Sequence, residues 1–275
     1  MQTTGSGSEG QRLTTEERQR QIEELLRRQG LASLREIMEV TGASVATSRR
    51  DLTSLERRGL LARIRGGARA IQRQSTLEEE FEIRQSRDRR EKRLIGQRAA
   101  RLIDDGMTVY LTDGTTSFAL AQCLVRRHIT VVTGALNIAQ LLAGCAGVEV
   151  IVIGGRLRAT SFGTIGPLAV DTIHTVHADI AVINADGITP QGGVRDYSLD
   201  DAASARAMSE NSNHTLVMAA PSRIGYEAQA KVLDWAQVDT LVTAYLPAPF
   251  TTAIGAKGVR VLNVARRTER DLRLG

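Results

Sequence analysis

From residue 107 to residue 264, runs of aliphatic and β-branched residues alternate with helical patterns, and this alternation limits the fold more than any other feature. The runs predicted as strands are residues 107–111, 129–132, 148–153, 180–183, 216–219, 241–243 and 259–264. The helical patterns between them cover residues 118–127, 136–142 and 202–208. Alternating strands and helices favour a mostly parallel sheet covered by helices, so the sequence predicts an α/β domain.

The first quarter of the chain has a different pattern, in which three short helices precede a hairpin. Capping signals mark where these helices begin and end: Thr14 with Glu17, Ser33 with Glu36, and Ser44 followed by Gly59. Residues 60–65 and 68–71 are extended runs around Gly66-Gly67, which is typical of a β-hairpin. Three helices and a hairpin predict a winged helix-turn-helix.

The two patterns predict a chain of two domains with a tail and a connector. We expect a flexible tail over residues 1–13, a winged helix-turn-helix over 14–72, a charged helical connector over 73–91, and an α/β effector-sensing domain over 92–275. No apolar run reaches the roughly 18 residues that span a bilayer, and the first residues lack a signal peptide's apolar core. These observations favour a cytoplasmic protein without a membrane partner.

The cysteine content argues against a disulfide framework or a metal cluster. The chain has two cysteines, Cys123 and Cys145, which we expect to be buried small apolar residues. The histidines show no spacing typical of metal ligands. The sequence therefore predicts no metal and no cofactor.

The excess positive charge of the chain is concentrated near its amino end. Residues 11–70 hold 13 arginines and 8 acidic residues, a difference of +5 that equals the net charge of the whole chain. Lysine occurs only at positions 92, 231 and 257, so the basic side chains of this segment are all arginine. Arginine offers forked donors that suit phosphates and guanine edges. A small excess of positive charge can also serve only the solubility of a protein, and the residue pattern of the predicted DNA-binding helix distinguishes this alternative from nucleic-acid binding.

The second helix of a helix-turn-helix places its first residues nearest the bases of DNA. The hydroxyl and guanidinium side chains found there are Ser44, Thr47, Ser48, Arg49 and Arg50, and the predicted wing adds Arg63, Arg65 and Arg69. We predict that these residues bind a double-stranded operator. The alternative is a solvated amphipathic helix, which accounts poorly for the small polar cluster before Arg49.

The same residues resemble the DeoR family of bacterial transcriptional regulators. Its pattern is Ser-x-x-Thr-x-Arg-Arg-Asp-Leu, followed by Gly-Gly-Ala at the wing. Residues 44–52 and 66–68 carry every fixed residue, and Ser48 stands where an apolar residue is usual. The resemblance continues at Lys92, Ile95, residues 114–116, Thr133 and Gly154-Gly155. It implies a C-terminal sensor domain that is similar in fold to ribose-5-phosphate isomerase and that senses phosphorylated sugars or related metabolites.

Residues at the ends of three predicted strands also point to a ligand site. Residues 112–117 follow a strand and open a helix, where free N–H groups and hydroxyls suit a phosphate. Ligands of open α/β sheets bind at the carboxyl ends of strands. The predicted effector-binding residues are Thr112, Asp113, Gly114, Thr115, Thr116, Thr133, Gly154, Gly155, Arg156 and Arg223.

Several positions depart from the family pattern and leave the usual ligand open. Thr112 stands in place of an aspartate, with Asp113 one residue later, and Gly134 replaces an asparagine. The segment Glu-Ala-x-x-Lys becomes residues 201–205 and ends in Ala205, while Arg223 stands at the position of a later lysine. Losing lysines removes positive charge, and Asp113 would repel a phosphate. A less anionic metabolite, or none, is therefore an alternative.

The sequence as a whole predicts a sequence-specific transcriptional regulator. We expect a repressor of a sugar or carbon operon, a homodimer or homotetramer that a sugar phosphate or related metabolite releases from its operator. One alternative is a regulator whose C-terminal domain has lost effector sensing. Another is an isomerase-like enzyme, for which Asp113, Asp186 and Asp201 offer carboxylates; its lysine is replaced by Ala205, so we expect no catalytic residues.

Overall fold

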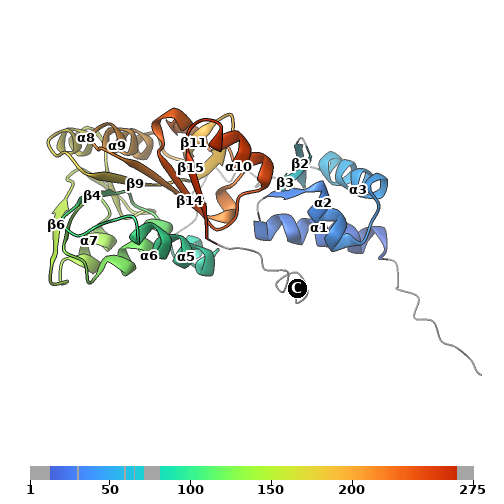
Figure 1. Ribbon diagram of the computed structural model, residues 1–275, viewed down its shortest axis with the longest axis horizontal. Helices are drawn as coiled ribbons and strands as arrows, with labels where there is room; N and C mark the ends of the chain where they lie inside the picture. Colours follow the sequence, from blue (N-terminus) through green and yellow to red (C-terminus); the bar gives the residue numbers. More distant parts are fainter. Residues whose placement is uncertain (1–12, 30, 59, 65, 71–80, 265–275) are drawn as a thin grey trace, which may run out of the picture. The chain divides into compact units, whose positions relative to one another are not determined.

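The structure, a computed structural model, describes residues 13–29, 31–58, 60–64, 66–70 and 81–264. These residues fall into two compact units, divided between Gln72 and Arg73 (Figure 1). The predicted tail up to residue 12, and residues 73–80 of the predicted connector, lie outside the described residues.

The first unit contains three helices and a small antiparallel sheet. The helices are α1 (Thr15–Gln29), α2 (Leu34–Thr41) and α3 (Val45–Arg57), and the strands are β1 (Leu31–Ser33), β2 (Leu61–Ile64) and β3 (Gly67–Ala70). The strand order is β1-β3-β2. The predicted helices and hairpin are confirmed, whereas β1 was not predicted because three residues between two helices show no periodicity.

Local capping sets the helix bounds in this unit. The Ser33 hydroxyl accepts a hydrogen bond from the Glu36 N–H (3.2 Å), and the Glu36 carboxylate accepts one from the Ser33 N–H (2.8 Å). Gly42, with φ 63°, ends α2 in a conformation that favours glycine. The apolar faces of the helices then form one core with the sheet, from Ile22, Leu25, Leu26, Ala32, Ile37, Leu52, Leu55, Leu61 and Ala68.

A seven-stranded sheet forms the centre of the second unit. Its strands are β4 (Thr108–Leu111), β5 (Ile129–Thr133), β6 (Val148–Val152), β9 (Ile180–Asn184), β12 (Thr215–Ala219), β14 (Thr240–Thr243) and β15 (Arg260–Asn263). They lie in the order β15-β14-β12-β9-β4-β5-β6, and every pair is parallel. Each predicted strand is found within one residue of its expected ends, so the parallel α/β fold is confirmed.

Helices cover both faces of this sheet (Figure 1). One face carries α5 (Arg89–Ala100), α6 (Thr115–Leu124) and α7 (Leu136–Leu142), and the other carries α8 (Pro167–His174) and α9 (Leu199–Glu210). A further helix, α10 (Ala248–Gly255), packs near β15. Before α5 lies the short α4 (Phe81–Ser86), and Asp88, with φ 53°, separates the two.

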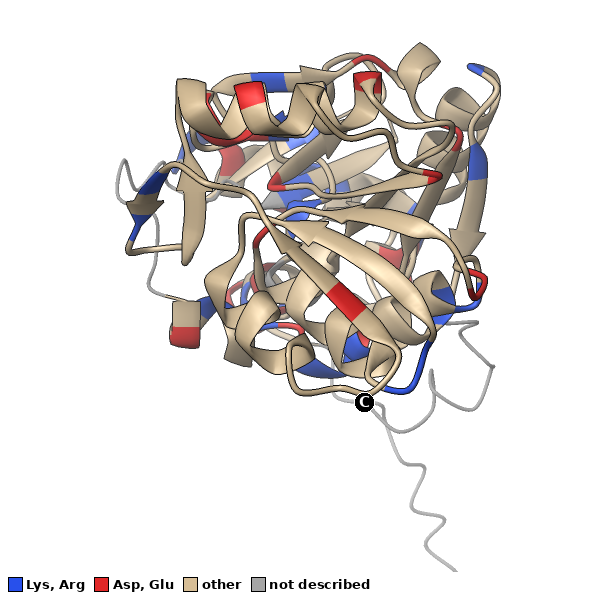
Figure 2. Ribbon diagram, turned by 90° about the vertical axis from the view of Figure 1, so that its left-hand side faces the viewer, with Lys and Arg blue, Asp and Glu red and all other residues tan. Residues whose placement is uncertain are grey.

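Short strands that the sequence did not reveal form two small sheets separate from the central one. They are β7 (Arg156–Arg158), β8 (Gly163–Ile165), β10 (Gly187–Thr189), β11 (Gly193–Asp196) and β13 (Ala230–Leu233). No run of three or more aliphatic or β-branched residues marks them in the sequence. Acidic and basic residues are spread together over the helices and loops of this unit (Figure 2). Within the described ranges, no helix is both long and apolar enough to cross a membrane.

Candidate functional site

In the first unit, α2, residues 42–44 and α3 form the helix-turn-helix. The Ser44 hydroxyl caps α3 by accepting a hydrogen bond from the Thr47 N–H (3.3 Å). Arg49 and Arg50 are exposed on the following turn, and their side chains project about 100° apart around the helix axis. The start of α3 therefore presents hydroxyls and two guanidinium groups to solvent.

Ser48, which the sequence analysis predicted to contact DNA, does not reach this surface. Its side chain is fully buried, and its hydroxyl has no hydrogen-bond partner among the described residues. Positions 48, 52 and 55 share the inner face of α3, where Leu52 and Leu55 pack into the core. The prediction for Ser48 was wrong. The family pattern signalled this, because an apolar residue is usual at that position.

The wing is bonded directly to α3. The Arg63 N–H donates to the Glu56 carboxylate (3.0 Å), and the Arg63 guanidinium donates to the Thr53 hydroxyl (3.2 Å). Arg63 is exposed and Arg69, on β3, is half-buried. Arg65 lies outside the described residues. The hairpin thus holds Arg63 beside the exposed face of α3.

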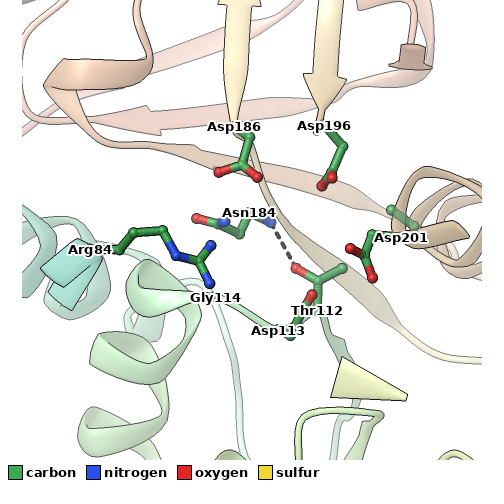
Figure 3. Close-up of a pocket in the computed structure, with 9 residues that line it drawn as sticks. Arg84, Thr112, Asp113, Gly114, Asn184, Asp186, Asp196 and Asp201 are labelled. Atoms are coloured by element: carbon green, nitrogen blue, oxygen red, sulfur yellow. Dashed lines mark hydrogen bonds between the residues drawn. The ribbon is translucent and has the colours of Figure 1, made fainter. Parts of the chain in front are cut away.

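In the second unit, a pocket lies at the carboxyl ends of β4 and β9. It is lined by Arg84, Thr112, Asp113, Gly114, Asn184, Asp186, Asp196, Asp201 and Ala205. Asp186 and Asp196 point toward Asp113 from the opposite side, with Arg84 entering from α4 and Asp201 from α9 (Figure 3). From β4 the chain builds the sheet outward through β5 and β6, and from β9 it builds in the other direction. The pocket therefore lies at the point where strand order reverses, a usual place for a ligand.

A hydrogen bond between a threonine side chain and the backbone joins β4 to β9 at the pocket. The Thr112 hydroxyl accepts a hydrogen bond from the Asn184 N–H (2.8 Å) and lies 3.4 Å from the Val182 carbonyl oxygen. Gly114 has φ 108°, and a Cβ atom there would lie 2.6 Å from the Asn184 side-chain nitrogen. A larger residue at position 114 would displace Asn184 from the pocket wall.

The structure brings together some of the predicted effector residues. Thr112, Asp113 and Gly114 line the pocket, and Thr115 and Thr116 are buried at the start of α6. Arg223 stands behind the lining, with its guanidinium 3.5 Å from the Asp186 carboxylate and bonded to the Tyr197 hydroxyl (3.0 Å).

The remaining predicted effector residues do not line the pocket, which corrects the sequence analysis. Thr133 is buried, and its hydroxyl donates to the Leu111 carbonyl (2.7 Å). Gly154 and Gly155 follow β6 on the surface, and Arg156 pairs with Asp200 (3.0 Å). For the residues after β6 the reason is the strand order, because β5 separates β6 from β4.

Sequence reasoning missed other lining residues as ligand contacts. Asn184 and Asp186 follow the predicted strand at 180–183, so the rule that selected Thr112 would also have found them. Arg84 belongs to a helix of six residues and Asp196 to a strand of four. No periodicity or motif signals either one.

Burial and crowding of carboxylates raise their pKa values. Burial, followed by the charge of Asp201, raises the pKa of Asp113 to about 7, although a hydrogen bond with Ser161 and the charge of Arg84 oppose this shift. For the same leading reason the pKa of Asp196 lies well above its ordinary value, and that of Asp201 is also raised. A Cβ atom on Gly163 would lie 2.8 Å from the Asp113 carboxylate, so the backbone after β7 covers this group closely.

Asp113→Asn is expected to stabilise the second unit more at pH 8 than at pH 5. The pKa of Asp113 is about 7 in the folded protein and 3.8 ordinarily, so between these values the folded state holds a proton that the unfolded state loses. The free energy of unfolding of the wild type therefore falls as the pH rises through this window. Asparagine does not titrate, so the variant does not lose stability at this site as the pH rises. Urea unfolding of both proteins at the two pH values measures the difference. An equal difference at both values contradicts the assignment.

Family comparisons cover both units. The model of the DeoR-like helix-turn-helix domain matches residues 18–74, and that of the DeoR C terminal sensor domain matches residues 87–244. The putative aga operon transcriptional repressor of Escherichia coli O157:H7 is 30% identical over 96% of this chain and 99% of its own length. The glycerol-3-phosphate regulon repressor of Escherichia coli (strain K12) is 30% identical over 81% of this chain and 88% of its own.

A third relative and one solved structure complete the comparison. The transcriptional repressor AccR of Agrobacterium fabrum is 35% identical over 76% of this chain and 82% of its own. Ribose 5-phosphate isomerase A from Methanocaldococcus jannaschii aligns with 48% of this chain and 53% of its own at 14% identity, with a TM-score of 0.37 that is too low to support an argument. The two domain models and the full-length relatives agree with the winged helix and the α/β unit described above. The chain belongs to the DeoR family of transcriptional regulators and is a regulator rather than an enzyme.

Proposed function

We propose that this protein represses a carbohydrate operon by binding its operator through α3 and the wing, and that a small metabolite in the pocket of the second unit releases it. The exposed arginine pair at the start of α3 is the observation that carries the proposal. The relatives named for the aga operon and the glycerol-3-phosphate regulon support the link to carbohydrate genes. The family resemblance makes a phosphorylated sugar the first expectation for the metabolite.

The proposed DNA-binding residues differ in whether their side chains suit phosphate oxygens or base edges. Ser44 and Thr47, with the free N–H groups at the start of α3, suit phosphate oxygens. Arg49 and Arg50 suit a base edge and a phosphate, and Arg63 and Arg69 suit the neighbouring backbone. Arg65 lies outside the described residues, and we include it among the proposed DNA contacts because of its place in the sequence. Two copies would place two winged helices on half-sites about one helical turn, or a multiple of it, apart.

Binding of the full chain to its own promoter fragment, measured by gel shift at increasing salt, tests the proposal. We expect the logarithm of affinity to fall linearly with the logarithm of salt concentration, by about 0.9 for each phosphate neutralised. Retention of no genomic fragment at low ionic strength contradicts the proposal. A second unit whose melting temperature no metabolite changes would instead favour a repressor that has lost sensing.

The helix α4 connects the pocket to the segment that leads to the first unit. Arg84 is buried in the pocket wall, donates to the Thr160 carbonyl (2.8 Å), and accepts a hydrogen bond from Lys92 through its own carbonyl (2.5 Å). Phe81 packs edge-on against Phe118 and Phe162, with ring centroids 5.9 and 5.5 Å away. A ligand that moves Arg84 therefore moves the first described helix after residues 71–80.

Arg84→Ala is expected to leave operator binding within about twofold of wild type and to abolish release by ligand. The ligand can act only through a difference in affinity between two states, and Arg84 is the proposed sensor of that difference. Gel shifts with and without the carbohydrate that most raises the wild-type melting temperature measure both effects. Arg90→Ala, an exposed arginine of α5, is the control. Normal release by the Arg84 variant contradicts this route.

A further inference from the structure

We infer that the pocket binds a polyhydroxylated ligand with a protonated amine, such as an amino sugar, and rejects phosphorylated forms. The inference rests on the proposed sensing function and narrows it to a chemical class. It departs from the phosphorylated sugar that the family resemblance implies.

The pocket wall is predominantly acidic. Asp113, Asp186, Asp196 and Asp201 line it, and Arg84 is the single basic lining residue among those the structure describes. Two more arginines stand behind the wall, where Arg223 lies 3.5 Å from Asp186 and Arg158 lies 3.2 Å from Asp201. Four carboxylates thus face three guanidinium groups.

Of the four lining aspartates, Asp113 and Asp196 make no ion pair with another described residue. Asp113 hydrogen-bonds with the Ser161 hydroxyl, and Asp196 accepts a bond from the Ser198 N–H (2.8 Å). Neither partner carries a positive charge. The groups that face Asp113 are Asp201 from α9, Asp186 after β9 and Arg84 from α4, so like charges outnumber the opposite one. A bound ammonium group would favour the charged form of both carboxylates and would balance that charge.

The rest of the lining suits hydroxyl groups. Carboxylate oxygens accept hydrogen bonds from hydroxyls, and the Asn184 side-chain amide makes no hydrogen bond with a described residue, so it offers both a donor and an acceptor. The Arg84 guanidinium adds donors from α4. The lining therefore offers hydrogen-bond partners for the hydroxyls of a small ligand as well as for its amine.

The charge of the pocket wall is unfavourable for a phosphate group. Its negative charges would face four aspartate side chains, and α9 contributes Asp201 and Ala205 to the lining but no cation. Ala205 is buried and small, so a lysine introduced there would extend toward the pocket space. This position offers a way to reverse the charge preference with one substitution.

Melting temperature and titration calorimetry of the full chain test the inference with matched ligands. The probes are D-glucosamine, D-glucose and D-glucose 6-phosphate, together with the same three forms of D-galactose, at equal concentrations. In at least one series we expect the amino form to bind about tenfold or more tightly than the phosphate, with the neutral sugar between them. Binding of a phosphate at least as tight as that of its amino form overturns the inference. The absence of detectable binding for all six ligands also overturns the inference.

Ala205→Lys should invert this order, lowering affinity for the amino form about tenfold and raising affinity for the phosphate. Ala203→Lys is the matched control, because Ala203 lies on the same helix but does not line the pocket. Asp196→Asn, which keeps the size of the side chain, should also weaken amine binding and covers the case in which Ala205→Lys fails to fold. Equal effects of both lysine variants, or unchanged binding to the Asp196 variant, overturn the inference. Operator binding without ligand is measured separately, and its loss counts against the proposed function instead.

Discussion

Replacing both Arg49 and Arg50 by alanine is expected to weaken operator binding by at least about 100-fold near physiological salt. A forked contact to a base is worth about 1–3 kcal/mol, and a lost phosphate contact weakens binding in a salt-dependent way. Two losses of about 1.4 kcal/mol each give this factor. The slope of affinity against salt should also fall by roughly one for each phosphate contact removed. Fluorescence anisotropy with a labelled operator measures affinity and slope together.

Arg57→Ala supplies the matched control for this pair. It removes one positive charge from the same helix, about 12 Å further along the axis than Arg49, at 1.5 Å per residue, and its side chain is exposed. We expect its affinity to stay within about threefold of wild type. Because all three arginines are exposed, none of the variants should change the melting temperature of the first unit. Wild-type affinity in the double variant would show that another surface contacts DNA.

Gly67→Ala should destabilise the first unit by about 2–4 kcal/mol and abolish operator binding with it. A Cβ atom on Gly67 would lie 2.1 Å from the Ala32 carbonyl oxygen and 2.8 Å from the Ser33 Cα, both of which belong to the backbone of β1. Backbone atoms cannot rotate away, so β3 must separate from β1. Calorimetry should show a lower transition temperature for the first unit and an unchanged one for the second.

Gly66→Ala separates close packing from backbone strain in this prediction. Gly66 has φ 90°, but no atom lies within 4 Å of a Cβ added there. An alanine costs roughly 1 kcal/mol for the left-handed conformation alone. A Gly67 variant no less stable than the Gly66 variant would mean that β1 and β3 are not packed as described.

The sequence predicted the fold most successfully where patterns were long. The seven strands of the central sheet each carry several apolar positions, and Ser33, Glu36 and Ser44 signal helix starts through their own hydrogen bonds. Such signals are local, so they need no knowledge of tertiary structure. β1 pairs with β3, and β13 pairs with β11, across long stretches of chain that no local pattern records, whereas β7–β8 and β10–β11 are short hairpins that no apolar run marks.

The pocket was predicted only in part because strand order is a tertiary property. The rule that ligands bind at strand ends selected Thr112, Thr133 and Gly154 equally. Only Thr112 lies where β4 meets β9. A single sequence gives the succession of strands but not which of them become neighbours, and Asp196 and Asp201 reach the site through connections after β9.

The buried Ser48 hydroxyl leaves the winged helix with stability to gain. An unpartnered buried polar group costs about 1–3 kcal/mol, and Ser48 lies on the buried face of α3, whereas Arg49 and Arg50 are exposed. Removing one oxygen atom there would give a sturdier stand-alone module for operator selection or for fusion to other sensors. The sequence specificity of this module would stay unchanged, because the substitution does not alter the surface proposed to contact DNA.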